Sequence, residues 1–161
     1  MEIKEVKKIV ILGTSNSGKT TALKHICSDM IKTTALDYGK TVINNKKTHF
    51  FSSPGNKRFK FMQDILCKNI NGAIIFIDNT KDITKNDMEI IKFVEEKRVP
   101  FVIFANKQDI SNKCLNIEFI KAPIIPTIAI NGMGINHGLK ILLDLIDQNE
   151  TNPPLKAICS S

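Results

Sequence analysis

Gly13-Thr14-Ser15-Asn16-Ser17-Gly18-Lys19-Thr20 is the stretch that decides the fold of this chain. It matches the pattern G-x-x-x-x-G-K-[ST]. The apolar run at residues 9–12 before it predicts a buried strand, and residues 19–30 after it can form a helix. Between a strand and a helix, the backbone N–H groups of such a loop surround phosphates and the helix N-terminus faces them. The stretch therefore predicts a phosphate-binding loop (P-loop) rather than a Gly- and Ser-rich turn with no ligand.

The residue types in this loop each suit a bound nucleotide. Glycine at positions 13 and 18 lets the chain turn where a side chain would block the phosphates. The Lys19 ammonium would reach the β- and γ-phosphates, and the Thr20 hydroxyl would ligate Mg²⁺. The nucleotide-binding residues expected here are Gly13, Thr14, Ser15, Asn16, Ser17, Gly18, Lys19, Thr20 and Thr21.

Apolar runs and helical periodicities alternate along the rest of the chain, which predicts a mostly parallel α/β sheet with helices on both faces. Two short strands joined by a turn at residues 44–47 add one antiparallel hairpin at a sheet edge. The six expected strands are 8–12, 41–43, 48–51, 73–77, 101–105 and 127–130. The expected helices are 19–30, 61–69, 84–97 and 139–146, with a short one at 115–121; residues 31–40 are expected to form a mobile loop.

Size and composition indicate one globular domain. The 161 residues are 42% hydrophobic and carry a net charge of +7. Because the lysines are spread along the whole sequence, we expect a solvated basic surface rather than a nucleic-acid site. We expect a nucleotide-binding domain at residues 1–149 and a loose tail at 150–161.

The sequence gives no sign of export or membrane attachment. No apolar run reaches the roughly 18–20 residues of a membrane span, and neither a signal peptide nor a lipidation box is present. The four cysteines are far apart and form no C-x-x-C pair, so we expect reduced thiols in a cytoplasmic protein.

A second motif, Asn106-Lys107-Gln108-Asp109, predicts which base the nucleotide carries. It reads N-K-x-D and follows a buried strand. An aspartate carboxylate can accept hydrogen bonds from N1–H and the N2 amino group of guanine, whereas adenine has neither donor. Since an unpaired buried charge costs several kcal/mol, Asp109 would select guanine strongly. We expect Asn106 to tie this loop to the P-loop and the Lys107 stem to lie along the base.

With these two motifs in place, the chain resembles a small GTPase of the Ras-like superfamily, a P-loop NTPase of G-domain fold, over residues 7–148. The segments Lys32-Thr33-Thr34-Ala35-Leu36-Asp37-Tyr38-Gly39 and Ser53-Pro54-Gly55-Asn56-Lys57-Arg58-Phe59 are most similar to prokaryotic small GTPases. Those are related to the gliding-motility polarity GTPase and, more distantly, to the Arf and SRP-receptor β branch.

The resemblance implies roles for further residues. Thr34, with Thr33 as the other candidate, would be the switch I threonine that binds Mg²⁺ and senses the γ-phosphate. Gly55 would be the switch II glycine whose N–H meets that phosphate, and Ala129, followed by Ile130, would contact guanine. The catalytic residues implied are Lys19, Thr34, Gly55 and Asn56.

The chain departs from the family pattern at two positions. The usual D-x-x-G box reads Ser52-Ser53-Pro54-Gly55, so the carboxylate that normally supports Mg²⁺ is missing, and Asp37 or Asp78 are the candidates to compensate. Asn56 stands where these proteins carry the water-orienting glutamine and is one methylene shorter, which predicts slow hydrolysis because positioning supplies much of this catalysis. Arg58 is the nearest candidate for a cation supplied in cis, a surface or partner contact being its other interpretation.

The expected function is that of a Mg²⁺-dependent guanine-nucleotide switch that hydrolyses GTP slowly and meets effector and regulatory proteins through residues 31–40 and 53–62. The alternative is a scaffold that holds GTP or GDP without turnover. A P-loop nucleotide kinase fits less well, because the sequence shows no lid or second phosphate site and has no use there for N-K-x-D.

Overall fold

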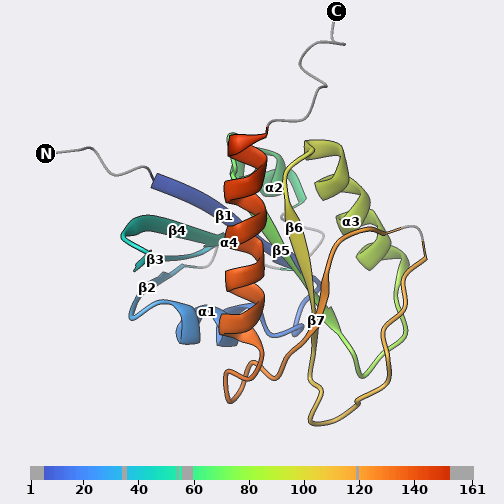
Figure 1. Cartoon of the computed structure of the whole chain (residues 1–161). Coiled ribbons are helices and arrows are strands. Elements are labelled where there is room, and N and C mark those ends of the chain that lie inside the picture. Colours follow the sequence, from blue (N-terminus) through green and yellow to red (C-terminus); the bar gives the residue numbers. More distant parts are fainter. Residues whose placement is uncertain (1–5, 34–35, 54, 56–59, 119, 153–161) are drawn as a thin grey trace, which may run out of the picture.

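The computed structural model describes residues 6–33, 36–53, 55, 60–118 and 120–152. They form seven strands and four helices (Figure 1). In chain order these are β1 Val6–Gly13, α1 Lys19–Ile26, β2 Asp29–Lys32, β3 Asp37–Ile43, β4 Lys46–Ser52, α2 Lys60–Leu66, β5 Gly72–Asp78, α3 Lys85–Lys97, β6 Phe101–Asn106, β7 Ile124–Pro126 and α4 Ile135–Thr151.

The strands make one sheet in the order β2-β3-β4-β1-β5-β6-β7. The five strands from β4 to β7 are parallel, whereas β3 runs antiparallel to both β4 and β2. The parallel strands bring the segments that follow β1, β5 and β6 to the same edge of the sheet, where ligands bind in folds of this kind.

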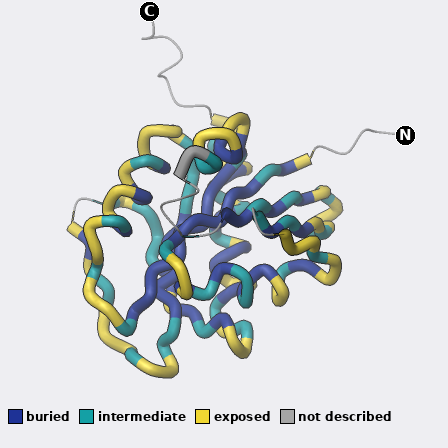
Figure 2. Tube along the Cα trace, turned by 180° about the vertical axis from the view of Figure 1, so that it is seen from behind, coloured by how far each residue is buried: buried dark blue, intermediate teal, exposed yellow. Residues whose placement is uncertain are grey.

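Helices cover both faces of the sheet and enclose two apolar cores. Alternate side chains of the central strands point to opposite faces: Ile9 and Ile11 of β1 pack with α1 and α4, while Val10 and Leu12 pack with α2 and α3. Figure 2 shows the central strands as the buried part of the molecule and the outer turns as exposed. The sheet is therefore a rigid support for the loops at its edge.

Several sequence predictions are confirmed. The hairpin of β3 and β4 is antiparallel, with paired residues from Asp37–Ser52 to Ile43–Lys46. Helix α3 begins at the predicted capping box: the Thr84 hydroxyl accepts from the Asp87 N–H at 3.1 Å, and the Asp87 carboxylate accepts from the Thr84 N–H at 2.9 Å. The buried strands β5 and β6 lie where their apolar runs placed them.

The segment after α1 differs from its prediction. Instead of a helix through residue 30 and a loop at 31–40, α1 ends at Ile26, and Asp29–Lys32 forms the edge strand β2 paired with β3. Pairing of Met30 with Gly39 and of Ile31 with Tyr38 decides this structure, because hydrogen bonding to a neighbouring strand outweighs the weak helical preference of so short a segment. The sheet consequently has seven strands rather than six.

Two predictions in the last third of the chain are also wrong. The final strand is Ile124–Pro126, and residues 127–130 instead form a loop closed by the bridge between Ile128 and Met133. Pro123 just before this strand and Pro126 at its end count against a strand when the sequence is considered alone. Pro126 is tolerated because β7 is an edge strand that can lack an N–H donor. No helix forms at 115–118. The chain just before these residues is held by the Asn79 side chain, which donates to the carbonyls of Ser111 at 2.8 Å and Lys113 at 3.0 Å.

Helix α4 continues through Thr151, beyond the residue 150 at which the sequence suggested a tail. Its outer end is attached to the sheet by the buried Lys7 of β1, whose ammonium pairs with the Glu150 carboxylate. Within residues 6–33, 36–53, 55, 60–118 and 120–152, no helix combines the length and the apolar character needed to cross a bilayer.

Candidate functional site

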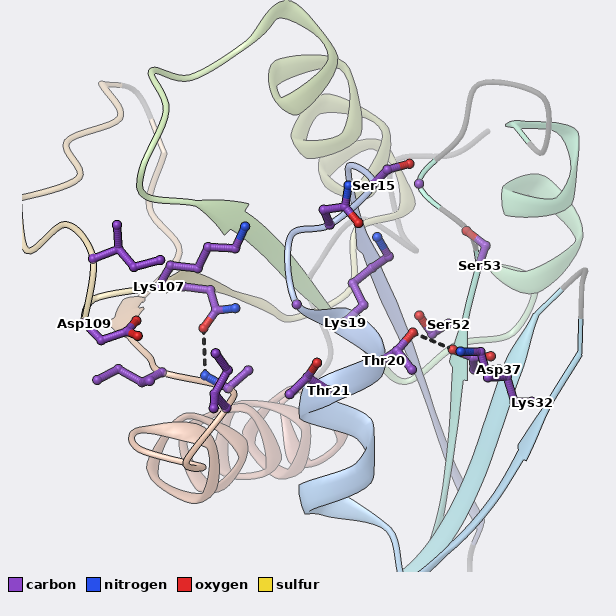
Figure 3. A pocket seen from close by; sticks show the side chains of 18 of the residues that line it. Ser15, Lys19, Thr20, Thr21, Lys32, Asp37, Ser52, Ser53, Lys107 and Asp109 are labelled. Carbon is purple, nitrogen blue, oxygen red and sulfur yellow. Dashed lines mark hydrogen bonds between the residues drawn. The ribbon is translucent and has the colours of Figure 1, made fainter.

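A cavity of about 550 Å³ lies at the carboxyl edge of the sheet (Figure 3). That volume is within the usual range of small-molecule sites. Its lining comes from five parts of the sequence: the P-loop with the start of α1, the β2–β3 region, the end of β4 with the segment after it, the loop after β6, and the loop after β7. The structure therefore brings the two sequence motifs to one cavity.

The P-loop wraps the N-terminus of α1. Gly18 precedes the helix at φ 107°, and a Cβ placed there would lie 2.0 Å from Nδ2 of Asn106, so both the turn and the close approach require glycine. The Lys19 ammonium donates to the carbonyl oxygens of Gly13 at 2.9 Å and Thr14 at 2.7 Å. Lys19 is thereby held across the loop, at the place where phosphates would lie.

Burial lowers the pKa of Lys19 to about 8, although the nearby negative charge of Asp37 acts in the opposite direction. In the protein without nucleotide, Lys19 therefore loses its proton at a lower pH than an ordinary lysine does. A phosphate anion favours the charged form and raises this pKa.

This shift predicts that nucleotide binding takes up protons. At pH 8 and above, we expect net proton uptake when GDP binds, and an affinity that declines as the pH rises further, because a neutral Lys19 must first be protonated. Calorimetric titrations in buffers that differ in ionisation enthalpy measure the uptake. Binding without proton uptake at pH 8 would contradict the lowered pKa.

Asn106 joins the end of the cavity where the sequence predicts a base to the end where it predicts phosphates. Its amide nitrogen donates to the Ser17 carbonyl at 2.8 Å. Its amide oxygen accepts from the Thr127 hydroxyl at 3.1 Å and from the Ala129 N–H at 2.9 Å. One buried side chain therefore fixes the P-loop, the N-K-x-D loop and the loop after β7 at set positions relative to one another, as the sequence predicted for the first two.

The other residues predicted at the base lie around the same end. Asp109 is exposed and lines the cavity. The cavity is also lined by Lys107, Ile110, Ala129 and Ile130. The Lys107 ammonium forms an ion pair with Asp78 at 2.8 Å. Burial acts to raise the pKa of Asp78, but hydrogen bonds from Lys107 and Thr80 and the Lys107 charge hold it below its ordinary value. Asp78 thus anchors the Lys107 side chain, a contact that the sequence did not reveal.

The predicted switch residues are described in part. Thr34, Asn56 and Arg58 lie outside the described residues. Gly55 packs directly on the P-loop, since a Cβ built on it would lie 2.2 Å from the Ser15 nitrogen and 2.6 Å from the Gly13 oxygen. Only a residue without a side chain fits at this position, and it lies beside the phosphate end of the cavity.

Thr20, the residue predicted to ligate Mg²⁺, donates its hydroxyl to the Asp37 carboxylate at 2.8 Å. Asp37 is buried, and its neighbour Ser52 on β4 is buried as well. No cluster of three or more His, Cys, Asp or Glu side chains suited to a metal occurs among the residues that the structure describes.

Comparison with known proteins gives similarity over most of the chain. The model of the ADP-ribosylation factor family matches residues 1–146. The uncharacterized protein MJ1339 of Methanocaldococcus jannaschii is 44% identical over 115 residues, covering 68% of this chain and 75% of that protein. ADP-ribosylation factor-like protein 4A of Homo sapiens is 28% identical over 164 residues, covering 86% of this chain and 82% of the relative.

Among solved structures, the Arl6 small GTPase of Trypanosoma brucei with the bound nucleotide analogue GppNp superimposes with a TM-score of 0.73. It is 20% identical, and the match covers 89% of this chain and 99% of that one. At this identity the likeness concerns the fold: a mixed sheet with parallel central strands and an antiparallel hairpin toward one edge.

Proposed function

This chain belongs to the ADP-ribosylation factor family of small GTPases, and from that membership we propose that it is a Mg²⁺-dependent guanine-nucleotide switch with slow GTP hydrolysis. Family membership carries guanine-nucleotide binding and the GTPase fold. We further propose that the chain lies near the prokaryotic small GTPases, and that its nucleotide-binding unit ends with α4 at Thr151.

The observation that carries the proposal is the bridge formed by Asn106. Its hydrogen bonds to Ser17 and Ala129 fix the distance between a phosphate-binding loop and a base-binding loop in one cavity. A ligand with a phosphate at one end and a guanine at the other suits that arrangement. Gly13 to Thr21 would contact the phosphates, and Lys107, Asp109, Ala129 and Ile130 would surround the base.

The donors at the phosphate end fit Mg²⁺: the Thr20 hydroxyl lies beside a buried carboxylate. When bound, Mg²⁺ would neutralise charge on the β- and γ-phosphates. Lys19 would bind those phosphates, Gly55 would offer its N–H to the γ-phosphate, and Thr34 would complete the sensing of that group. We propose that effector and regulatory proteins contact residues 31–40 and 53–62, the segments adjoining this end.

Slow turnover follows from Asn56, because a shorter amide holds the attacking water less well. We expect intrinsic hydrolysis no faster than the roughly 10⁻⁴ per second scale of an unassisted Ras-like protein. Single-turnover hydrolysis of bound GTP measures it, and Asn56→Gln should raise the rate. The absence of any turnover, including in the presence of cell extract, would favour the scaffold that retains GTP.

Competition binding tests the nucleotide assignment itself. A fluorescent GDP analogue bound to the wild-type protein should be displaced by GDP and GTP at concentrations at least a hundredfold below those needed of ADP and ATP, because adenine cannot pair with Asp109. Equal displacement by adenine and guanine nucleotides would refute the assignment.

A further inference from the structure

A row of polar residues crosses the sheet below the P-loop. Lys32 of β2 is paired with Asp37 of β3, Asp37 is paired with Ser52 of β4, and Ser52 is in turn paired with Ile11 of β1. Figure 3 shows Asp37 and Ser52 beside Thr20, at the end of the cavity away from Asp109. Asp37 and Ser52 are thus two neighbouring positions that both line the cavity.

The carboxylate in this row belongs to Asp37. It is 7% exposed and accepts the Thr20 hydroxyl hydrogen bond at 2.8 Å. Its charge also acts on Lys19, since it opposes the effect of burial on the Lys19 pKa. Asp37 therefore interacts with both Lys19, which would meet the phosphates, and Thr20, which would meet the metal.

From this geometry we propose that Asp37 takes over the metal-supporting role of the aspartate that Ser52 replaces, so that the Mg²⁺ carboxylate has moved across one strand pair from β4 to β3. The proposal deepens the proposed function and rests on it, because the metal accompanies the nucleotide. Asp37 would orient Thr20 and the water ligands of the metal, as carboxylates beside metal sites commonly do.

The other candidate carboxylates are placed elsewhere. Asp78, at the end of β5, is engaged with Lys107 and Thr80. Of the acidic residues that the structure describes, Asp37 and Asp109 line the cavity, and Asp109 lies at its base end. Among the acidic residues that the structure describes, Asp37 is accordingly the one placed to support a metal at the phosphate end of the cavity.

The cross-strand pairing also explains why Ser52 is neutral. Directly opposed residues in antiparallel strands have Cβ atoms about 5 Å apart, and like charges in such a pair destabilise the sheet. A carboxylate at position 37 therefore disfavours a second one at position 52. Ser52→Asp alone would create that repulsion, whereas exchanging the two residues would return the carboxylate to β4 without it.

Placing the metal-supporting carboxylate on β3 instead of β4 would change which segment of the chain responds to Mg²⁺. Asp37 follows the predicted switch threonine, Thr34, by three residues. Besides Thr20, the two residues proposed to act on Mg²⁺ are Thr34 and Asp37, and both would then belong to residues 31–40. The segment that begins at Ser52 would sense the γ-phosphate through Gly55 alone.

The test is the release rate of a fluorescent GDP analogue across a titration of Mg²⁺, compared with release in excess EDTA. Four proteins are needed: the wild type, Asp37→Asn, the exchange variant Asp37→Ser/Ser52→Asp, and Asp29→Asn as a matched control. Asp29 is an exposed carboxylate on β2 that does not line the cavity. Asp37→Asn keeps the side-chain shape, and release in EDTA together with circular dichroism verifies the fold of each variant.

For Asp37→Asn, we expect the Mg²⁺ concentration that half-maximally slows release to rise by about 10- to 100-fold, the range found when groups supporting metal ligands are removed. Release in EDTA should change less than about threefold, the exchange variant should recover most of the loss, and Asp29→Asn should match the wild type. A Mg²⁺ titration of Asp37→Asn that superimposes on the wild type would overturn the proposal while leaving guanine-nucleotide binding intact. A wild-type protein that binds no GDP would overturn the proposed function and this proposal together.

Discussion

Replacing Lys19 with alanine should weaken GDP and GTP binding by about a thousandfold. The Lys19 ammonium is held in the P-loop by the carbonyls of Gly13 and Thr14, so it needs little movement to meet the phosphates. Two charge-assisted hydrogen bonds at about 1.5–3 kcal/mol each account for a loss of that size. The loss should be similar for both nucleotides, because Lys19 contacts phosphates and not the base.

Equilibrium titration with a fluorescent GDP analogue measures this loss. Lys24→Ala is the matched control, since Lys24 lies on the same helix but is exposed and outside the cavity. We expect its affinity to stay within about twofold of the wild type, as for surface changes in general. Equal, small effects of Lys19→Ala and Lys24→Ala would mean that the P-loop does not bind the phosphates.

Asp109→Asn should exchange guanine specificity for xanthine specificity. The carboxylate accepts from the N1–H and N2 amino groups of guanine, whereas the asparagine amide can donate to the O2 oxygen of xanthine. Losing charged hydrogen bonds worth about 1.5–3 kcal/mol each should lower GDP affinity by roughly 100-fold or more. XDP affinity should rise in the same variant, so the ratio of the two dissociation constants should reverse.

Direct titration of both diphosphates against the wild type and the variant gives that ratio. Asp82→Asn serves as the control, because Asp82 forms an exposed ion pair with Lys113 and does not line the cavity. If Asp109→Asn reduced GDP affinity without any gain for XDP, Asp109 would support the loop rather than read the base.

Features coded by adjacent residues could be predicted from the sequence. The P-loop, the strands of apolar residues before Asp78 and Asn106, and the capping box at Thr84 are each determined within a short window, and the structure contains all of them. The bridge from Asn106 to the P-loop was also predictable, since N-K-x-D follows a parallel strand and so had to lie at the same edge of the sheet.

The features that were missed depend on contacts between distant segments. Strand β2 exists because it pairs with β3, and its own four residues carry no clear pattern. Strand β7 contains Pro126, which counts against a strand unless its position at the edge is known. The sequence left Asp37 and Asp78 as equal candidates, because the contact of Asp37 with Thr20 depends on the register of β3 on β4, which cannot be obtained from spacing.

Hydrogen exchange of the wild-type protein in its two nucleotide states tests the central claim, that this chain is a guanine-nucleotide switch, most directly. GDP and GTP differ by the γ-phosphate, which Lys19, Thr34 and the Gly55 N–H are proposed to sense. We predict slower exchange with a non-hydrolysable GTP analogue than with GDP in residues 31–40 and 53–62, the order–disorder change of a GTPase switch. The central strands β1, β5 and β6 should exchange alike in both states. Identical exchange of the two segments with GDP and with the analogue would contradict the switch and leave a static nucleotide-bound scaffold.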